Sequence, residues 1–148
     1  MRVVVADASA LLEYLLGTDA SGPIREVVRA ADADVHVPAL CDVEIAAGLR
    51  RALLRGVLQG ERASDALADY MDLPLSRHGH RSLMPRIFEL KPNFSAYDAC
   101  YAALAERLGG ELLTADQRLS RAVRDHTDVN VLPRRSRARC GSDHRPSS

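Results

Sequence analysis

Short apolar runs that fit β-strands alternate with longer segments that fit helices, and this alternation constrains the fold more than any other feature of the chain. Strands are predicted at residues 2–6, 35–40, 111–115 and 129–133, with a further short one at 72–75. Helical periodicity, capping signals and glycine or proline stops predict a first helix that ends at residue 16 and further helices at residues 22–32, 41–55, 61–71, 81–90, 95–110 and 117–126. This order is typical of an α/β domain in which helices wrap a parallel sheet.

The charge distribution divides the chain into a body, residues 1–133, and an arginine-rich tail, residues 134–148. The 148 residues carry 20 basic and 20 acidic side chains, so no overall basic field indicates nucleic-acid binding. Five arginines and one aspartate fall in the tail, which leaves the body with 15 basic and 19 acidic residues and a net charge of −4. We expect one folded domain over residues 1–133 and a disordered tail, because the tail has too few apolar side chains to form a core.

The cysteines and histidines do not form a zinc-binding pattern. Cys41, Cys100 and Cys140 are odd in number and lack metal-ligand spacing, and the first two fall in helical patterns that favour a packing role. His78 and His80, in "RHGHR", have no suitably spaced partners, so a surface loop is the favoured interpretation. The sequence shows neither a signal peptide nor an apolar run of membrane-spanning length. We therefore expect a cytoplasmic protein with reduced thiols and no membrane partner.

Two aspartates directly follow predicted strands. Asp7 comes after a continuous valine-rich run that suits a strand buried on both faces, and Asp116 follows "ELLT". The carboxyl ends of parallel strands meet at one edge of the sheet, where α/β proteins hold their functional crevice. We therefore expect both carboxylates at that edge. Each could equally be an ordinary helix N-cap, whose side-chain oxygen accepts a backbone N–H of the first turn.

Two further acids lie near helix starts and have no basic partner one turn later. Glu44 is followed at that distance by Ala47 and Gly48, small residues that indicate a close approach of the backbone to another group. Asp98 lies in one of the most apolar helical segments of the chain. It also completes a capping box with Ser95, so a purely local role remains open for it.

The joint placement of these four acids favours a shared function over four separate ones. Carboxylates a few ångströms apart cannot all remain ionised without compensation, and a divalent cation supplies it. Hard oxygen ligands without histidine or cysteine indicate Mg²⁺ or Mn²⁺ rather than zinc. Such an ion activates water and stabilises the leaving oxygen of a phosphodiester, alone or as a pair about 3.5–4 Å apart. We therefore predict one metal site formed by Asp7, Glu44, Asp98 and Asp116.

With these acids in order, the chain resembles the PIN-domain family, in particular the VapC-type toxins of prokaryotic toxin–antitoxin pairs. The matching stretches are "VVADASALL", "VPALCDVEIAAGLRR", "SAYDACYAALAERLGGELLTADQRL" and "VNVL", which together run from about residue 2 to residue 132. The resemblance implies a three-layer α/β sandwich with a central parallel sheet, and a Mg²⁺- or Mn²⁺-dependent endoribonuclease that cleaves RNA of the tRNA or rRNA class. It also implies a homodimer and a cognate VapB-type antitoxin. Apolar faces on the helices at 61–71 and 81–90 would suit an amphipathic antitoxin helix, although core packing explains them equally well.

The resemblance implies that the family's metal-binding and catalytic acids are Asp7, Glu44, Asp98 and Asp116. The first three would bind the ion and the fourth would hold a coordinated water or a second ion. Ser9 and Thr114 match small hydroxyl positions beside the acids. Members often carry another acid shortly after the fourth, where this chain has Gln117 and Arg118, so the presence of a second metal position stays open. Asp42 is interpreted as a cap of the Glu44 helix rather than as an extra ligand.

RNA has to approach an acidic pocket, so basic side chains on its rim are expected to hold flanking phosphates. The candidates are Arg50, Arg51, Arg118 and Arg121, each of which also suits an ordinary solvated helix surface. The chain has no tryptophan and 4% aromatic residues, so contacts to RNA shape and backbone should matter more than base stacking.

Other phosphoryl-transfer and binding proteins fit the sequence less well. A phosphatase of the haloacid dehalogenase type needs a second aspartate where this chain has Ser9, and a suitably placed lysine where the chain offers only Lys91. A phospho-receiver domain does not fit either, because it too needs a suitably placed lysine. Two alternatives stay open: a PIN-domain ribonuclease of RNA processing, and a catalytically inactive module that binds RNA or protein.

Overall fold

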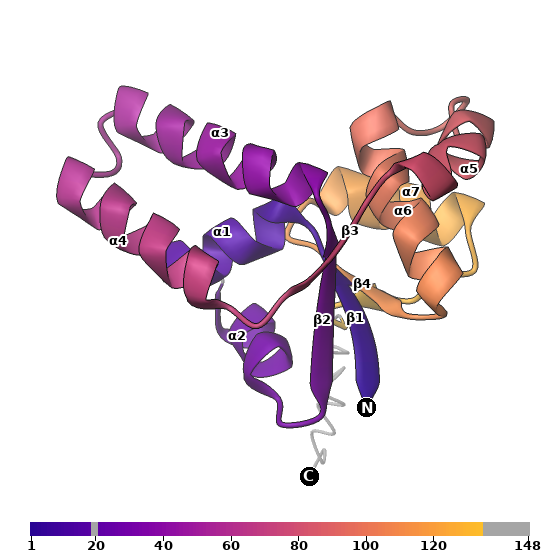
Figure 1. Ribbon diagram of the computed structural model, residues 1–148, viewed down its shortest axis with the longest axis horizontal. Helices are drawn as coiled ribbons and strands as arrows, with labels where there is room; N and C mark the ends of the chain where they lie inside the picture. The colour runs from indigo at the N-terminus through magenta and orange to yellow at the C-terminus, as the bar shows by residue number, and fades with distance from the viewer. Residues whose placement is uncertain (19–20, 135–148) are drawn as a thin grey trace, which may run out of the picture.

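The structure is a computed structural model that describes residues 1–18 and 21–134 (Figure 1). The strands of this part form one parallel sheet and are β1 (Arg2–Ala6), β2 (Ala33–Pro38), β3 (Ser76–His78), β4 (Glu111–Leu113) and β5 (Val131–Leu132). Their order across the sheet is β3-β2-β1-β4-β5, so β1 lies at the centre between β2 and β4. This position explains the valine run, because Val4, Val5 and Ala6 are completely buried.

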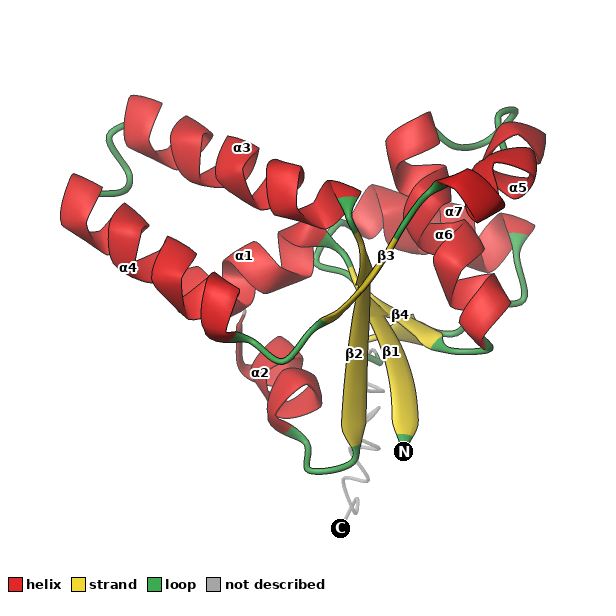
Figure 2. Cartoon of the chain, in the orientation of Figure 1, coloured by secondary structure: helices red, strands yellow, loops and turns green. Residues whose placement is uncertain are grey.

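Helices cover both faces of the sheet (Figure 2). In the described part they are α1 (Ala8–Leu16), α2 (Gly22–Arg29), α3 (Leu40–Leu54), α4 (Gly60–Asp72), α5 (Met84–Glu89), α6 (Ala96–Leu108) and α7 (Gln117–His126), with a 3₁₀ turn at Arg81–Leu83 before α5. Helices α1 to α4 lie on one side of the sheet and α5 to α7 on the other (Figure 2). The predicted three-layer α/β sandwich is thereby confirmed. The prediction of a disordered arginine-rich tail concerns residues that lie almost entirely outside the described ones.

Strand β3 begins later than predicted. The sequence favoured a strand at 72–75, but the ladder starts at Ser76, which pairs with His36 of β2. Pro74 has no N–H to donate to a ladder, and the N–H of Leu75 bonds to the carbonyl of Leu73 at 2.8 Å instead. This stretch therefore forms a tight connection between α4 and the sheet.

Two helices are shorter than predicted. Helix α2 ends at Arg29 because Ala30 leaves the helical region with ψ 134°, and the chain reaches β2 three residues later. The helix predicted at 81–90 is a 3₁₀ turn followed by α5, with Pro85 in the first turn of α5. Proline suits this place because an N–H there has no partner within the helix.

Helix α6 is buried on nearly all sides. Residues 99–105 are all buried, since the helix contacts β1, β2 and β4 of the sheet and packs against α5. The Tyr97 side chain, in the first turn of the helix, is an exception and is 63% exposed. The alanines of this helix allow the close packing that a one-sided stripe would not require.

The small residues after Glu44 have a packing cause. Helix α3 crosses α1 at Gly48, where a Cβ atom would collide with the side chain of Leu12. The close approach that the sequence indicated is therefore one between two helices. It fixes α3 against the segment that follows Asp7.

The two histidines of "RHGHR" are part of the folded body. His78 lies in β3 and its Nε2 is hydrogen-bonded to Nδ1 of His36 at 2.8 Å, while His80 Nε2 accepts the backbone N–H of Leu40 at 2.9 Å. The surface-loop interpretation is wrong for His78, because the strand pairs this residue with Pro38. The imidazoles tie β3 and the following turn to β2 and to the start of α3.

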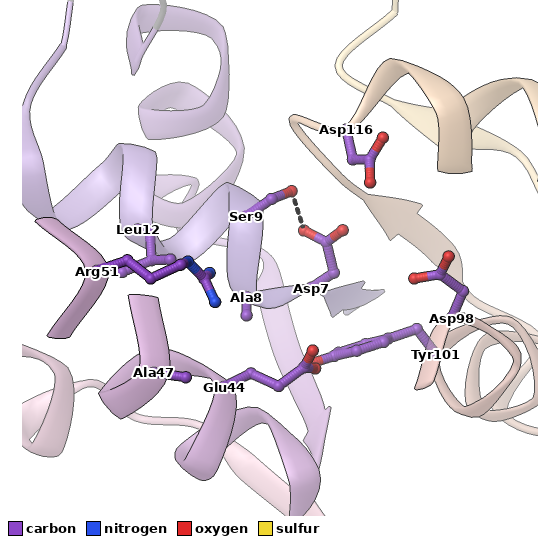
Figure 3. A pocket seen from close by; sticks show the side chains of 10 residues that line it. All are labelled: Asp7, Ala8, Ser9, Leu12, Glu44, Ala47, Arg51, Asp98, Tyr101 and Asp116. Carbon is purple, nitrogen blue, oxygen red and sulfur yellow. Dashed lines mark hydrogen bonds between the residues drawn. The ribbon is translucent and has the colours of Figure 1, made fainter. Parts of the chain in front are cut away.

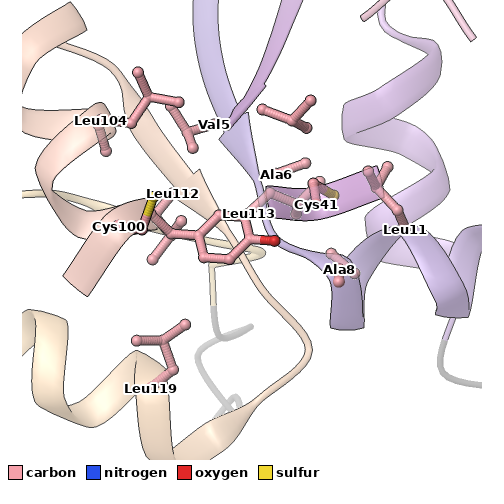
Figure 4. Packing of buried hydrophobic residues seen from close by; sticks show 14 of the residues in the cluster. Val5, Ala6, Ala8, Leu11, Cys41, Cys100, Leu104, Leu112, Leu113 and Leu119 are labelled. Carbon is pink, nitrogen blue, oxygen red and sulfur yellow. The ribbon is translucent and has the colours of Figure 1, made fainter. Parts of the chain in front are cut away.

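Cys41 and Cys100 are buried free thiols in the core between the sheet and the helices (Figure 4). Burial raises the pKa of each thiol to about 11, as desolvation disfavours the thiolate. The predicted packing role of both is confirmed. Among the described residues, no helix combines the length and the apolar character that crossing a membrane requires.

A candidate metal centre at the carboxyl edge of the sheet

The structure places the four predicted acids around one pocket. This pocket has a volume of about 260 Å³ and is lined by Asp7, Glu44, Asp98 and Asp116 together with Ala8, Ser9, Leu12, Ala47, Arg51 and Tyr101. The carboxylates of Asp7, Asp98 and Asp116 face a common space, and that of Glu44 lies beside Tyr101 (Figure 3). Residues that are up to 109 positions apart in the sequence therefore share one cavity.

Asp7 is the most enclosed of the four acids. It follows β1 directly, is 4% exposed, and caps α1 by accepting the N–H of Ala10 through Oδ1 at 2.9 Å. The hydroxyls of Ser9 and Thr114 donate to its two oxygens at 2.7 and 2.5 Å. Burial raises the pKa of Asp7 to about 6 in spite of these hydrogen bonds, and the negative charge of Asp116 adds to the rise. The ordinary role of an N-cap and the proposed role in the pocket are thus combined in one side chain.

Ser9 and Thr114 join the two halves of the site. Ser9 Oγ accepts the N–H of Ala115 at 3.0 Å, and Thr114 Oγ1 accepts the N–H of Asp116 at 3.0 Å. The two hydroxyls are 3.3 Å apart. They therefore hold the loop after β4 against the start of α1 and position both flanking aspartates.

Glu44 is held by a residue that the sequence did not single out. The phenolic hydroxyl of Tyr101 in α6 donates to Glu44 Oε1 in α3 at 2.6 Å. Burial raises the pKa of the Tyr101 hydroxyl far above its usual range, and the nearby Glu44 carboxylate contributes, so the phenol stays protonated and donates. A signal was available, because Tyr101 follows Asp98 by three positions and so lies on the same face of a helix.

Asp98 and Asp116 share an arginine. Arg118 Nη2 is 3.0 Å from Asp98 Oδ2 and 3.8 Å from Asp116 Oδ2. Ser95 caps α6 by accepting the N–H of Asp98 at 3.1 Å, which is one half of the predicted capping box. The described hydrogen bond of the Asp98 carboxylate goes to Arg118 rather than back to Ser95. Asp116 is also the N-cap of α7, so its predicted local role holds as well.

Asp42 points away from the pocket, and its predicted capping role is wrong. Helix α3 begins at Leu40 with Ala39 as N-cap, so Asp42 lies inside the first turn. Its carboxylate accepts the Tyr70 hydroxyl at 2.5 Å and the Arg77 guanidinium at 3.0 Å. Asp42 therefore links α3 to α4 and β3.

The four candidate RNA-binding arginines occupy different places. Arg51 lines the pocket, at the end away from Asp98 and Asp116 (Figure 3). Arg118 contacts the acids themselves. Arg50 and Arg121 are exposed on α3 and α7 and do not contribute to the lining that the described residues form.

The donor set fits a hard divalent cation, although the side chains do not yet close around one. No three Asp, Glu, His or Cys side chains within residues 1–18 and 21–134 are arranged so that they could hold a metal ion as they lie. The pocket nevertheless offers four carboxylates and no imidazole or thiol, which is the ligand chemistry of Mg²⁺ and Mn²⁺. The described hydrogen-bond donors of Asp7 are all neutral, and burial raises the pKa of this carboxyl, so a cation nearby would favour its charged form. Side-chain rotations that draw the carboxylates together would complete the site.

Comparison with known proteins gives consistent matches over most of the chain. The family model of the PIN domain matches residues 4–125. Ribonuclease VapC9 of Mycobacterium tuberculosis is 42% identical over 132 residues, which are 89% of this chain and 100% of that protein. Ribonuclease VapC12 of the same organism is 29% identical over 130 residues, 88% of this chain and 99% of that protein.

Solved structures share the fold at low sequence identity. The Pyrobaculum aerophilum protein PAE2754 superimposes with a TM-score of 0.64 at 20% identity and covers 88% of this chain and 83% of its own. VapBC2 of Rickettsia felis, solved bound to a DNA fragment from its promoter, gives a TM-score of 0.64 at 10% identity, with coverage of 87% and 96%. Since the family model covers more than half of the chain and a relative is 42% identical along its whole length, the chain belongs to the PIN-domain family.

Proposed function

We propose that this chain is a divalent-metal-dependent endoribonuclease, the toxin of a VapBC-type toxin–antitoxin pair. The observation that carries the proposal is the pocket in which Asp7, Glu44, Asp98 and Asp116 meet at the carboxyl edge of the sheet. The relatives at 42% and 29% identity are named ribonucleases, which supports RNA as the substrate. We take Mg²⁺ or Mn²⁺ as the ion and RNA of the tRNA or rRNA class as the substrate.

Each acid has a distinct part in this mechanism. Asp7, Glu44 and Asp98 would hold the ion, and Asp116 would hold a coordinated water or a second ion. The bound ion supplies activation of water and stabilisation of the negative charge that develops on the phosphodiester. Because the acids come from the junction of β1 and α1, from α3, from α6 and from the loop before α7, their convergence depends on the folded sheet.

The neighbouring side chains hold the acids in their orientations and provide a contact for RNA. Ser9 and Thr114 hold the Asp7 carboxylate by donating to one oxygen each. Tyr101 fixes Oε1 of Glu44. Arg51, on the rim, is placed to contact a phosphate next to the scissile one, which would offset the repulsion between RNA and the acidic pocket.

A VapB-type antitoxin is the proposed partner, and a homodimer is the proposed assembly of the toxin. Large apolar side chains are exposed on helices outside the pocket, among them Leu67 and Met71 on α4 and Met84 and Phe88 on α5. Exposed apolar surface of this kind marks interaction sites, and an amphipathic helix is a suitable occupant. Copurification of the chain with the product of an adjacent antitoxin gene would test the partner, and light scattering of the separated toxin would test the dimer.

Cleavage of RNA by the purified chain tests the central proposal. Incubation with total RNA and Mg²⁺ or Mn²⁺, followed by mapping of new 5′ ends, should reveal discrete cuts that EDTA abolishes. Asp7→Asn and Asp98→Asn should each abolish the cuts, while Asp65→Asn, a change of an exposed acid on α4, should leave them intact.

Two results would contradict the proposal. Cleavage by Asp7→Asn at the wild-type rate would remove Asp7 from the mechanism. A wild-type protein that binds RNA but never cuts it, with either ion, would identify the chain as an inactive binding module.

A further inference from the structure

Arg118 occupies an unusual place for a basic residue. It is the second residue of α7, where the partial positive charge of a helix N-terminus disfavours a cation. Its guanidinium turns back to the pocket, where Nη2 lies 3.0 Å from Asp98 Oδ2 and 3.8 Å from Asp116 Oδ2. The two acids therefore offset an otherwise unfavourable position.

The arginine and the helix cap together engage both oxygens of Asp116. Oδ1 accepts the backbone N–H groups of Arg118 and Leu119 at 2.9 and 3.2 Å, and Oδ2 faces the Arg118 guanidinium. A divalent ion at Asp116 Oδ2 would therefore lie close to the positive charge of the guanidinium, which disfavours its binding there. Asp98 is engaged through Oδ2 as well.

Asp7 lies in the same pocket but has a different kind of hydrogen-bond partner. Its described hydrogen bonds come from two hydroxyls and one backbone N–H, all of them neutral donors. The described ion pairs of the pocket thus fall on the Asp98–Asp116 side, and the buried charge of Asp7 is left for an added cation.

We propose that Arg118 is a built-in counter-cation that competes with a second divalent ion for Asp98 Oδ2 and Asp116 Oδ2 and so confines the chain to one ion, which Asp7, Glu44 and the other oxygen of Asp98 would hold. This inference rests on the proposed function, because it requires that the pocket binds metal at all. The Arg118 side chain is 70% exposed, so it can leave the acids without disturbing the core. Exchange between guanidinium and ion is therefore a local movement.

The test is a titration of Mn²⁺ into metal-free protein without RNA, followed by calorimetry and by electron paramagnetic resonance of the free ion. The wild type should bind one Mn²⁺ per chain. Arg118→Gln, which keeps a polar side chain but removes the charge, should bind a second Mn²⁺ or bind the first about fivefold more tightly, the effect expected from the loss of one exposed ion pair at low salt. Arg118→Lys, which keeps the charge, and Arg124→Gln, a change of an exposed arginine of the same helix, should both bind as the wild type does.

A stability measurement supplies a second readout. In EDTA at low salt, Arg118→Gln should melt at a lower temperature than the wild type, because Asp98 and Asp116 then repel each other without compensation. Saturating Mn²⁺ should reduce this difference, since the ion replaces the lost positive charge.

The outcomes separate the two proposals. If the wild type and Arg118→Gln bind Mn²⁺ with the same number and affinity, the inference about Arg118 is overturned and the metal site stands. The inference is likewise overturned if Arg118→Lys behaves as Arg118→Gln does, since charge would not be the cause. If no variant binds Mn²⁺, the proposed function fails first.

Discussion

The hydroxyl of Tyr101 donates a hydrogen bond to Glu44 Oε1 at 2.6 Å, and this bond joins α6 to α3 beneath the acidic pocket. The two residues are 57 positions apart in sequence. Tyr101 thus fixes the one carboxylate of the four that comes from α3. The bond makes Tyr101 a positioning residue for the proposed metal site.

Replacement of Tyr101 by phenylalanine should weaken metal binding while the fold is kept. The ring would still fill its place in the core, but Glu44 would lose its orienting donor. Loss of such an outer hydrogen bond typically costs about 10- to 100-fold in metal affinity or activity. Calorimetric titration with Mn²⁺ and RNA cleavage should both show the loss. Tyr97→Phe, at an exposed position of the same helix, is the matched control and should change neither.

The buried charge of Asp7 should make metal-free protein less stable as the pH rises through the range of about 4 to 6. The folded-state pKa is about 6 and the ordinary value is 3.8, so the folded state binds more protons than the unfolded state between these values. The contribution of the Asp7 carboxyl to the free energy of unfolding is therefore complete below about pH 4 and is lost as the pH rises through 6. A shift of this size corresponds to about 2–3 kcal/mol.

Urea unfolding in EDTA between pH 4 and pH 8 would measure this effect. The difference in unfolding free energy between Asp7→Asn and the wild type should grow in favour of the variant as the pH rises. Asp65→Asn is the control and should follow the wild type. A constant difference between Asp7→Asn and the wild type across the range would contradict the assignment.

The histidine pair between β2 and β3 should make the sheet edge sensitive to acid. Burial lowers the pKa of His78, and the neighbouring His36 lowers it further. The folded state then binds fewer protons than the unfolded state below the ordinary value of 6.5, so stability falls as the pH drops through that value. The protection factor of the Ala39 N–H, which bonds to the His78 carbonyl, should be lower at pH 5.5 than at pH 7.5 once the exchange rates are corrected for the intrinsic effect of pH. His78→Gln should reduce this dependence, whereas the exposed His126→Gln should preserve it.

The crossing of α1 and α3 at Gly48 should not tolerate a side chain. Gly48→Ala places a methyl group against Leu12, which also lines the pocket. We expect a net destabilisation of about 1 kcal/mol in urea unfolding, because the usual overpacking cost of about 1–3 kcal/mol is partly offset by rotation of the Leu12 side chain and by the higher helix propensity of alanine, about 1 kcal/mol. Gly60→Ala, at a position with open space around the added atom, should be nearly neutral. Equal stabilities of the two variants would contradict the packing argument.

The main features of the site could be predicted because they follow from local pattern. Asp7 comes directly after a short apolar strand and Asp116 three residues after the end of another, and parallel strands bring such residues to one edge of the sheet. Asp98 and Glu44 required the resemblance as well, because a carboxylate near a helix start also serves as a cap or a solvated surface charge. The alternation of strands and helices was enough for the fold class.

The contacts that depend on tertiary packing could not be predicted. The partners of Asp42 are Tyr70 and Arg77, 28 and 35 residues away, so its position in the sequence favoured a cap that the structure does not contain. Arg118 looked like a solvated helix charge until the folded chain set it beside Asp98. The start of β3 was misplaced because pairing with β2, rather than local propensity, decides where the ladder begins.

The position of β1 has a consequence for synthesis of the protein. This first strand cannot complete its pairing until β4 has been synthesised, more than 100 residues later. The two strands pair at Val4 and Glu111. A nascent chain released from the ribosome only as far as α5 carries Asp7 and Glu44 but neither Asp98 nor Asp116. The nuclease chemistry proposed for the chain thus cannot begin during the first half of translation, and a chain split after α4 would regain it only when both fragments reassemble.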